Sequence, residues 1–208
     1  MEKFKLAIYT MHPIQYHAPI FRELAKEVEF ESTVLYADTL GLDEEYIPEF
    51  NTVIKWDVPL LDGYNYLFFK NYTNKRLGGF FSRINPGMFI HLLAKRYDAV
   101  LIHGYQTFSA WLVFLAAKLS GTKVIVRGEA IPKKEKRNWK GRLTCQVVKS
   151  YLALSDAVMY SCSGNKAYWK ELAVSESKMF FIPCAVDNAF FRWEQARHLP
   201  RRNEMRRD

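Results

Sequence analysis

Residues 98–126, DAVLIHGYQTFSAWLVFLAAKLSGTKVIV, decide the fold class of this chain. The segments 98–103 and 123–126 are short apolar runs, which is typical of strands buried on both faces. Between them, residues 109–120 are almost wholly apolar and long enough for a helix, and Gly121 is a residue that commonly ends one. The order strand, helix, strand predicts parallel strands joined by a covering helix.

The same alternation continues on both sides of this stretch. Further strands are expected at 5–10, 30–37, 157–161 and 179–182, with one or two short ones within 52–69. Further helices are expected at 18–27, from Asn85 and Pro86 to about residue 96, up to about residue 154, and at 163–173 with Ser163 as the cap. The prediction is an α/β, Rossmann-like, doubly wound and mainly parallel sheet with helices on both faces.

Composition excludes several classes of protein. The chain has 208 residues, of which 49% are hydrophobic and 25% charged, so a disordered or low-complexity protein is excluded. The longest apolar run, residues 110–117, is far shorter than the roughly 20 residues of a membrane span. No secretory leader is recognised, and the three cysteines form no Cys-x-x-Cys pair, so a reduced, cytoplasmic protein is expected.

The net charge of +8 is concentrated in two segments. Residues 133–142 contain six basic residues against one acidic residue, beginning with Lys133, Lys134, Lys136 and Arg137. Residues 192–208 contain six arginines against three acids. Such patches favour phosphate-rich partners, so these four side chains are expected to contact phosphate or an anionic membrane surface; the alternative is a solvated loop and tail. Nucleic acid is disfavoured because the aromatic residues lie far from this patch in the sequence.

Ligands of doubly wound sheets bind beyond the carboxyl ends of the strands. The first such loop holds His12, Gln15 and His17, which suit hydrogen bonding to hydroxyls, and a metal site is disfavoured because no Cys or carboxylate accompanies the two histidines. The middle strand ends in His103, Gly104 and Tyr105, where the glycine either allows a ligand close to the backbone or simply makes the turn.

Arg127 and Glu129 flank a glycine directly after an apolar strand. Two charges there are costly unless they pair or bind something, so both are expected to face the cleft. Arg127 suits a phosphate or carboxylate, and Glu129 suits a sugar hydroxyl or the role of a base. A purely structural ion pair is the alternative. Neither a Gly-x-Gly-x-x-Gly motif nor a Walker loop is present.

The aromatic residues of 62–81 allow two interpretations. Seven aromatic side chains occur in this stretch, beside several asparagines. They could stack on sugar rings or touch lipid, but a hairpin that packs on the edge of the sheet is preferred.

Four segments in order resemble the N-terminal, acceptor-side half of a GT-B glycosyltransferase similar to family 4. They are KLAIYTMHPIQYHAPIFRELAKE (5–27), YDAVLIHGY (97–105), GTKVIVRGEA (121–130) and LSDAVMYSCSGNKAYWKELAVSESKMFFIPCAVDNAFF (154–191). The last resembles the family pattern of a strand, a helix and a run ending in Val-Asp-x-x-x-Phe, here Val186, Asp187 and Phe191. The chain departs from the family in its first loop, at Arg127 and at Cys184.

The resemblance implies transfer of a sugar from a nucleotide-sugar substrate to a glycan or lipid-linked acceptor, with retention and without a metal or other cofactor. Together with the positions of these residues at the strand ends, it leads us to expect catalytic roles for His103, Arg127 and Glu129, and acceptor binding by His12, Gln15, His17, Gly104 and Tyr105. Residues 1–187 would form the Rossmann-like domain and 188–208 a short aromatic helix, packed back on the domain, and a basic tail. The donor-binding domain or subunit would be a separate partner, so the chain alone would be inactive. The alternatives are a partner- or membrane-docking module of a split enzyme and a GT-B-type sugar-nucleotide epimerase.

Overall fold

The computed structural model describes residues 2–42, 45–47, 51–54, 56, 58–73, 79–132 and 139–202. Seven strands form one parallel sheet in the order β5-β2-β1-β6-β7-β8-β9. Their bounds are β1 Phe4–Thr10, β2 Phe30–Tyr36, β5 Asn65–Phe68, β6 Ala99–His103, β7 Lys123–Arg127, β8 Ala157–Tyr160 and β9 Met179–Phe181. The predicted doubly wound α/β fold is confirmed.

Two features of the 45–68 region differ from expectation. β3 (Glu45–Ile47) and β4 (Thr52–Ile54) pair with each other antiparallel, outside the main sheet. Within the described residues 62–73 and 79–81, the aromatic stretch forms no hairpin on the sheet edge, because β5 joins the sheet as its parallel edge strand beside β2. Tyr36 and Phe68 stack at this edge with their ring centroids 5.1 Å apart, so the aromatic residues of β5 help to hold the edge strand in place.

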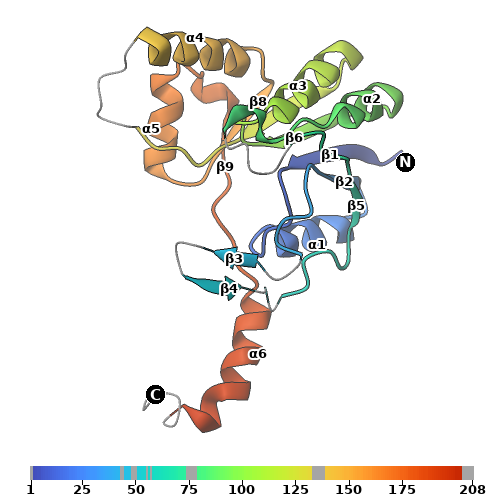
Figure 1. Ribbon diagram of the computed structural model, residues 1–208, viewed down its shortest axis with the longest axis vertical. Coiled ribbons are helices and arrows are strands. Elements are labelled where there is room, and N and C mark those ends of the chain that lie inside the picture. The colour runs from blue at the N-terminus through green and yellow to red at the C-terminus, as the bar shows by residue number, and fades with distance from the viewer. Residues whose placement is uncertain are drawn as a thin grey trace.

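Helices cover both faces of the sheet (Figure 1). α1 (Ala18–Lys26) lies on one face, and α2 (Pro86–Ala94), α3 (Phe108–Ser120), α4 (Trp139–Ala153) and α5 (Ser163–Glu171) lie on the other. α3 ends where predicted, because Gly121 adopts a left-handed φ of 76° that closes the last turn. The predicted cap of α5 shifts by one residue, since Cys162 rather than Ser163 accepts the hydrogen bond from the Asn165 backbone.

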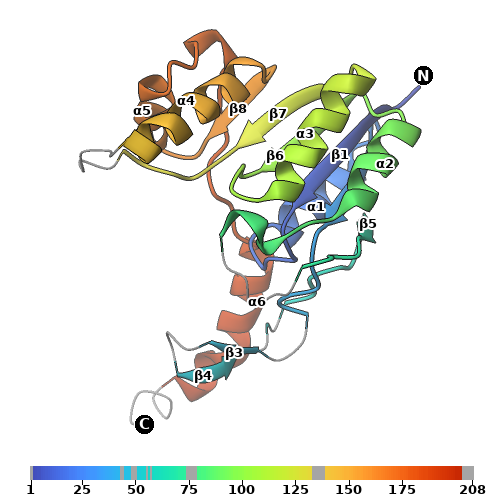
Figure 2. The same cartoon turned by 45° about the horizontal axis from the view of Figure 1, so that its top comes forward.

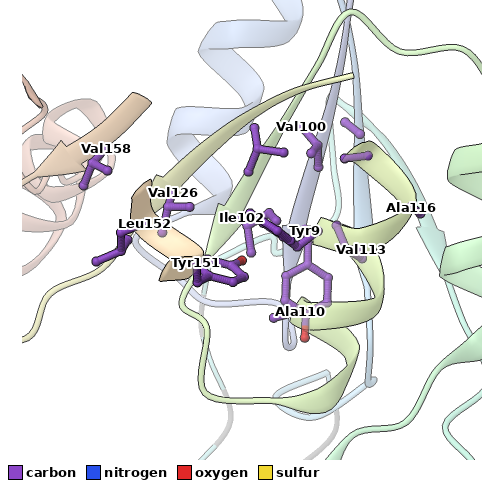
Figure 3. Packing of buried hydrophobic residues seen from close by; sticks show 14 of the residues in the cluster. Tyr9, Val100, Ile102, Ala110, Val113, Ala116, Val126, Tyr151, Leu152 and Val158 are labelled. Atoms are coloured by element: carbon purple, nitrogen blue, oxygen red, sulfur yellow. The ribbon is translucent and has the colours of Figure 1, made fainter. Parts of the chain in front are cut away.

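Two hydrophobic clusters share the strands between them. Strand residues alternate in direction, so Val100 and Ile102 of β6 pack toward α3 while Ala99 packs toward α1. Figure 3 shows Val113 of α3 and Tyr151 of α4 meeting these strand residues in the larger cluster. The two clusters therefore depend on the same strands.

Asn85 ties α2 to the sheet instead of capping its helix through the side chain. The residue is fully buried, and its amide donates to the carbonyl oxygens of Ala37 (3.0 Å) and Phe69 (2.9 Å). Its carbonyl oxygen accepts from the Ser109 hydroxyl at 2.8 Å, so one side chain joins β2, β5, α2 and α3. A helix does begin at Pro86 as expected, but no side-chain cap is made.

The last helix, α6 (Asn188–His198), projects away from the sheet in both views (Figures 1 and 2). The expectation that its aromatic residues pack back on the domain is wrong, because Phe191 is 57% exposed and Trp193 is 59% exposed. Asp187 begins the helix by accepting from the Phe190 backbone at 2.9 Å. Cap chemistry is local and readable from sequence, whereas the direction of the helix follows from its contacts with the rest of the chain.

Candidate functional site

The alternation of strand residues brings charged and polar side chains to one edge of the sheet. His103 ends β6 and Arg127 ends β7, and the two residues are paired in the strand register. Two residues earlier in each strand, the apolar side chains of Leu101 and Ile125 pack on the face of the sheet that α1 covers. Their side chains therefore emerge on that face at the carboxyl edge.

A cavity of about 380 Å³ opens at the carboxyl ends of β1, β6 and β7. Its wall contains side chains from the first loop, from both strand ends and from the segment after β7. The lining residues are Thr10, Met11, Ile14, Tyr16, His17, His103, Gly104, Tyr105, Gln106, Arg127, Gly128, Glu129 and Ala130. This position, beyond the carboxyl ends of parallel strands, is where doubly wound folds bind ligands.

Two imidazoles meet beside the cavity. The rings of His17 and His103 have centroids 4.5 Å apart. Burial, followed by the positive charge of Arg127, lowers the pKa of His17 to about 4, and burial with the neighbouring His17 and Arg127 holds the pKa of His103 well below its ordinary value. Both rings are therefore neutral at pH 7. Within the described part of the chain, Nδ1 of His17 and Nε2 of His103 are buried and have no hydrogen-bond partner.

Arg127 and Glu129 form a long ion pair at the mouth of the cavity. One guanidinium nitrogen of Arg127 lies 3.5 Å from Oε1 of Glu129, and the Arg127 side chain is 6% exposed whereas that of Glu129 is 48% exposed. Cys184, from the segment after β9, approaches both, with its Sγ 4.0 Å from the guanidinium and 3.9 Å from Glu129 Oε1. These contacts are longer than ideal charge-assisted hydrogen bonds, so the guanidinium retains capacity for a further anionic ligand.

Gly104 shapes the cavity through its backbone. Its φ is 77°, a left-handed value that favours glycine, and its N–H donates to the Arg127 carbonyl at 2.8 Å. No heavy atom lies within 4 Å of the position that a Cβ would take. The glycine thus makes the turn out of β6 and also leaves open space beside the cavity.

A second, apolar groove of about 360 Å³ lies on the α1 face of the sheet. It shares His17, His103 and Arg127 with the first cavity, and its other lining residues are hydrophobic. These three residues therefore form a wall between a polar cavity and an apolar groove. Their position explains why burial dominates the lowered pKa of both histidines.

Comparison with known proteins gives structural likeness only. No family model and no curated sequence matches the chain. Among solved structures, the Anabaena protein HepE in complex with UDP and glucose superposes with a TM-score of 0.57 at 11% identity, over 88% of this chain and 45% of that one. A UDP-N-acetylglucosamine 2-epimerase gives a TM-score of 0.53 at 18% identity and is matched over 86% of this chain and 48% of its own. The UDP-N-acetylglucosamine 2-epimerase from Rickettsia bellii gives a TM-score of 0.54 at 14% identity, over 96% of this chain and 48% of its own.

The chain has a Rossmann-like α/β fold that matches part of these structures. It spans about half the length of each of these structures. At such low identity the likeness concerns the fold, and the residues of the cavity must carry any functional argument.

Most of the strand-end residues that the sequence singles out meet in this fold. His17, His103, Gly104, Tyr105, Arg127 and Glu129 all line the polar cavity. His12 and Gln15 do not line it; the His12 ring turns back to the carbonyl oxygen of Pro13, 3.0 Å from Nδ1. The first loop thus contributes His17 to the cavity wall but leaves His12 and Gln15 outside it, so the expectation that all three line one site is wrong for His12 and Gln15.

Three cavity features escaped the sequence analysis. Tyr16 and Gln106 lie in the loops after β1 and β6, whose position beyond the strand ends was their signal, but neither was among the predicted site residues. The approach of Cys184 to Arg127 joins segments 57 residues apart, and its only signal was the position of Cys184 just after the last strand. In the described part of the chain, none of the three cysteines forms a disulfide.

The remaining sequence predictions concern charge, metal and membrane. Lys133, Lys134, Lys136 and Arg137 lie outside the described residues. Across the described ranges, no three His, Cys, Asp or Glu side chains converge as a metal site would require. Over the same ranges, no helix combines the length and the apolar character needed to cross a bilayer.

Proposed function

We propose that this chain is the acceptor-side half of a GT-B enzyme that uses a nucleotide sugar, and specifically of a glycosyltransferase. One observation carries the proposal: two neutral imidazoles, each with one buried nitrogen that has no partner in the described structure, and an incompletely paired Arg127–Glu129 unit line one cavity at the carboxyl edge of the sheet. Retention of configuration and likeness to family 4 rest on the sequence resemblance alone.

The imidazoles suit a sugar acceptor. A neutral imidazole offers one N–H donor and one lone pair, which matches the donor and acceptor capacity of a hydroxyl group. Because Nδ1 of His17 and Nε2 of His103 are buried and unpartnered in the described structure, a sugar hydroxyl in the cavity would satisfy atoms that are otherwise costly to bury. We therefore assign His17, with Gly104 and Tyr105 beside it, to acceptor binding.

The charged pair suits the chemistry of transfer. The Glu129 carboxylate is half-exposed at the cavity mouth, where it can accept the proton or hydrogen bond of an acceptor hydroxyl. The guanidinium of Arg127 can meet the charge of a phosphate on the donor, as Arg commonly does for phosphates. In this scheme the nucleotide sugar is the substrate, and the charged groups that act on the substrates are the side chains of Arg127 and Glu129.

The solved structures support the half-enzyme part of the proposal. HepE, which was solved with UDP and glucose, and the epimerases are each about twice as long as the part of them that this chain covers. We propose that a second domain or subunit binds the donor, and that this chain positions the acceptor against it. The isolated chain is then expected to bind sugars weakly and to transfer none.

A sugar-nucleotide epimerase is the second candidate, because two of the similar structures carry that name. In that reaction Glu129 would act as a base toward a carbon-bound proton of the sugar, and no acceptor would be needed. The two candidates differ in an exchange measurement. An epimerase incubated with its nucleotide sugar in D₂O incorporates deuterium into the sugar ring, whereas a transferase leaves ring protons in place.

The test is a titration of the isotope-labelled chain, followed by NMR, with neutral monosaccharides and separately with UDP-glucose. We expect shifts at His17, Gly104 and Glu129 with a neutral sugar and no tight binding of UDP-glucose. Glu129→Gln should weaken sugar binding, and Arg127→Ala should lower turnover in the complete enzyme, each by at least about tenfold without changing stability by more than about 1 kcal/mol. Glu194→Gln on α6 is the matched control.

Two results would overturn the proposal. Loss of stability in both variants, with unchanged sugar binding in Glu129→Gln and unchanged turnover of the complete enzyme in Arg127→Ala, would make the pair structural. Robust sugar transfer by the purified 208-residue chain alone would exclude the half-enzyme interpretation.

A further inference from the structure

The outer surface of α2, α3 and α4 is unusually apolar for a helix layer that faces solvent. These three helices lie side by side over one face of the sheet (Figures 1 and 2), and Phe114 of α3 stacks on Tyr151 of α4 with centroids 4.1 Å apart. Large hydrophobic side chains that turn away from the sheet are exposed on all three. They are Ile90, Leu115, Leu119, Leu143, Val147 and Leu154, the last just beyond the end of α4.

α4 shows that this exposure follows a pattern. Leu143, Val147 and Leu154 recur at intervals of four and seven residues, so they share one face of the helix. Leu143 is 60% exposed and Leu154 is 62% exposed, while Val148 and Leu152 pack into the core from the other side. An ordinary surface helix has polar residues where α4 has this second apolar stripe.

Trp139 extends the stripe at the start of α4. It lies four residues before Leu143, on the same face, and is 71% exposed. Tryptophan is favoured at a boundary between an apolar phase and water, because its ring is apolar and its N–H can form a hydrogen bond. The position of this residue therefore points to an interface between water and an apolar phase.

The charges on this layer have one sign. None of α2, α3 and α4 contains an aspartate or a glutamate. Arg142 and Lys149 lie beside the stripe on α4, and residues 133–138, which directly precede the helix in sequence, include four basic residues and one acidic one. Asp156, the first acid after α4, is already paired with Lys118 at 2.7 Å and Lys123 at 3.1 Å.

We propose that the outer face of α2, α3 and α4 is a docking surface for an anionic lipid bilayer, with the stripe of Trp139, Leu143, Val147 and Leu154 inserted at the level of the head groups. An apolar helix face with cations at its rim and no acids is the composition of helices that lie in the membrane interface. A protein partner would need acidic residues placed to match the basic rim, whereas anionic lipid head groups supply that charge along the whole layer. This surface is independent of the polar cavity and of the proposed enzymatic function.

The test is sedimentation of the purified chain with vesicles, without any sugar present. One set of vesicles is phosphatidylcholine and the other contains about 30% phosphatidylglycerol. We expect binding to the anionic vesicles, weakened by salt, and little binding to the neutral ones. The double variant Leu143→Gln/Val147→Gln should lose at least about tenfold in partition coefficient, because it removes two apolar side chains from the inserted face. Arg142→Gln/Lys149→Gln should weaken binding and reduce its dependence on salt.

The matched control is Phe191→Gln/Trp193→Gln on α6, which removes two aromatic side chains of similar exposure from a different surface. This variant should bind anionic vesicles like the unmodified chain. Since all substituted positions are exposed or at the surface, thermal unfolding should show each variant folded.

Three outcomes would overturn the proposal. Binding that survives the Leu143/Val147 change, or that is lost in the α6 control instead, would place the lipid contact elsewhere. Light scattering that shows a dimer abolished by Leu143→Gln/Val147→Gln would make the layer an interface between two copies of the chain. Absence of vesicle binding at low salt would exclude a lipid partner.

Discussion

Gly128 illustrates how closely the candidate site is built against the core. A Cβ on this residue would lie 2.8 Å from Cη2 of Trp169 and 2.9 Å from its Cζ2, and Trp169 is fully buried. The indole is also held by a hydrogen bond from its Nε1 to the Met159 carbonyl at 3.1 Å. The close packing of Gly128 on the fixed Trp169 ring therefore restricts the backbone conformation between Arg127 and Glu129.

We predict that Gly128→Ala lowers the free energy of unfolding by about 1–3 kcal/mol, because the added methyl group overpacks a rigid site. Gly164→Ala is the control, since its Cβ would meet Ile131 at an ordinary 3.5 Å within a helix, where alanine is favoured. Chemical denaturation of both variants measures the difference. Equal stability of the two variants would show that the chain relaxes around Gly128.

The two buried histidines, His17 and His103, predict that the stability of the fold depends on pH. The pKa of His17 is about 4 in the folded chain, below its ordinary value of 6.5, mainly because the ring is buried. Between these two pH values the unfolded chain binds a proton that the folded chain does not, so stability falls as the pH drops from 6.5 toward 4. His103, whose pKa is also lowered by burial, contributes in the same direction.

We predict that His17→Gln makes the free energy of unfolding less dependent on pH over this interval, by up to about 1.4 kcal/mol per pH unit for one proton. Denaturation curves at several pH values give the slope. NMR of the unmodified chain should also show a His17 ring that stays neutral at pH 5.5. An unchanged slope together with a ring that titrates near 6.5 would contradict the predicted burial effect.

Among the elements, α6 is the one whose stability is separate from the core. None of its residues is buried, and it begins at Asp187, which accepts from the Phe190 backbone and lies 3.4 Å from the guanidinium of Arg22 on α1. Arg22 also donates to the Pro59 carbonyl at 2.8 Å. Two side chains thus set where α6 begins and how it leaves the domain.

We predict that Asp187→Ala costs about 1 kcal/mol of helix stability in α6 and leaves the sheet unaffected. Hydrogen exchange of the α6 amides should quicken about fivefold, while the amides of β1 and β6 keep their protection. Asp187→Asn keeps a capping oxygen and removes the charge, so it should behave much more like the unmodified chain. Equal loss of protection throughout the sheet would mean that α6 is coupled to the core after all.

The whole molecule is held together by one sheet with two packed faces. β1, β6 and β7 each send alternate side chains into both hydrophobic clusters, so neither cluster can be lost without exposing the strands of the other. We predict a single thermal transition, in which the far-ultraviolet signal of the backbone and the near-ultraviolet signal of the buried aromatics change together. Two well-separated transitions would show that the two faces unfold independently.

Local pattern was enough to predict much of this protein. The apolar runs, Gly121 and the Asn85–Pro86 pair placed strands and helices, because these signals act over a few residues of backbone. Knowing that His103 and Arg127 follow parallel strands was enough to place both at one edge of the sheet. The same reasoning failed for His12 and Gln15, because the direction of a loop side chain depends on tertiary contacts, which the hydrophobic pattern of the sequence does not show.

The sequence by itself determined the fold class and the edge at which the site lies, since strand and helix periodicity and strand direction are encoded locally. Only the tertiary structure decided which groups meet there: Cys184 beside Arg127, His17 against His103, and Trp169 under Gly128. It also decided that β5 pairs parallel, that α6 leaves the domain, and that the outer stripe of α4 is exposed. These outcomes depend on strand order and on burial, and both are set by contacts between segments far apart in the chain.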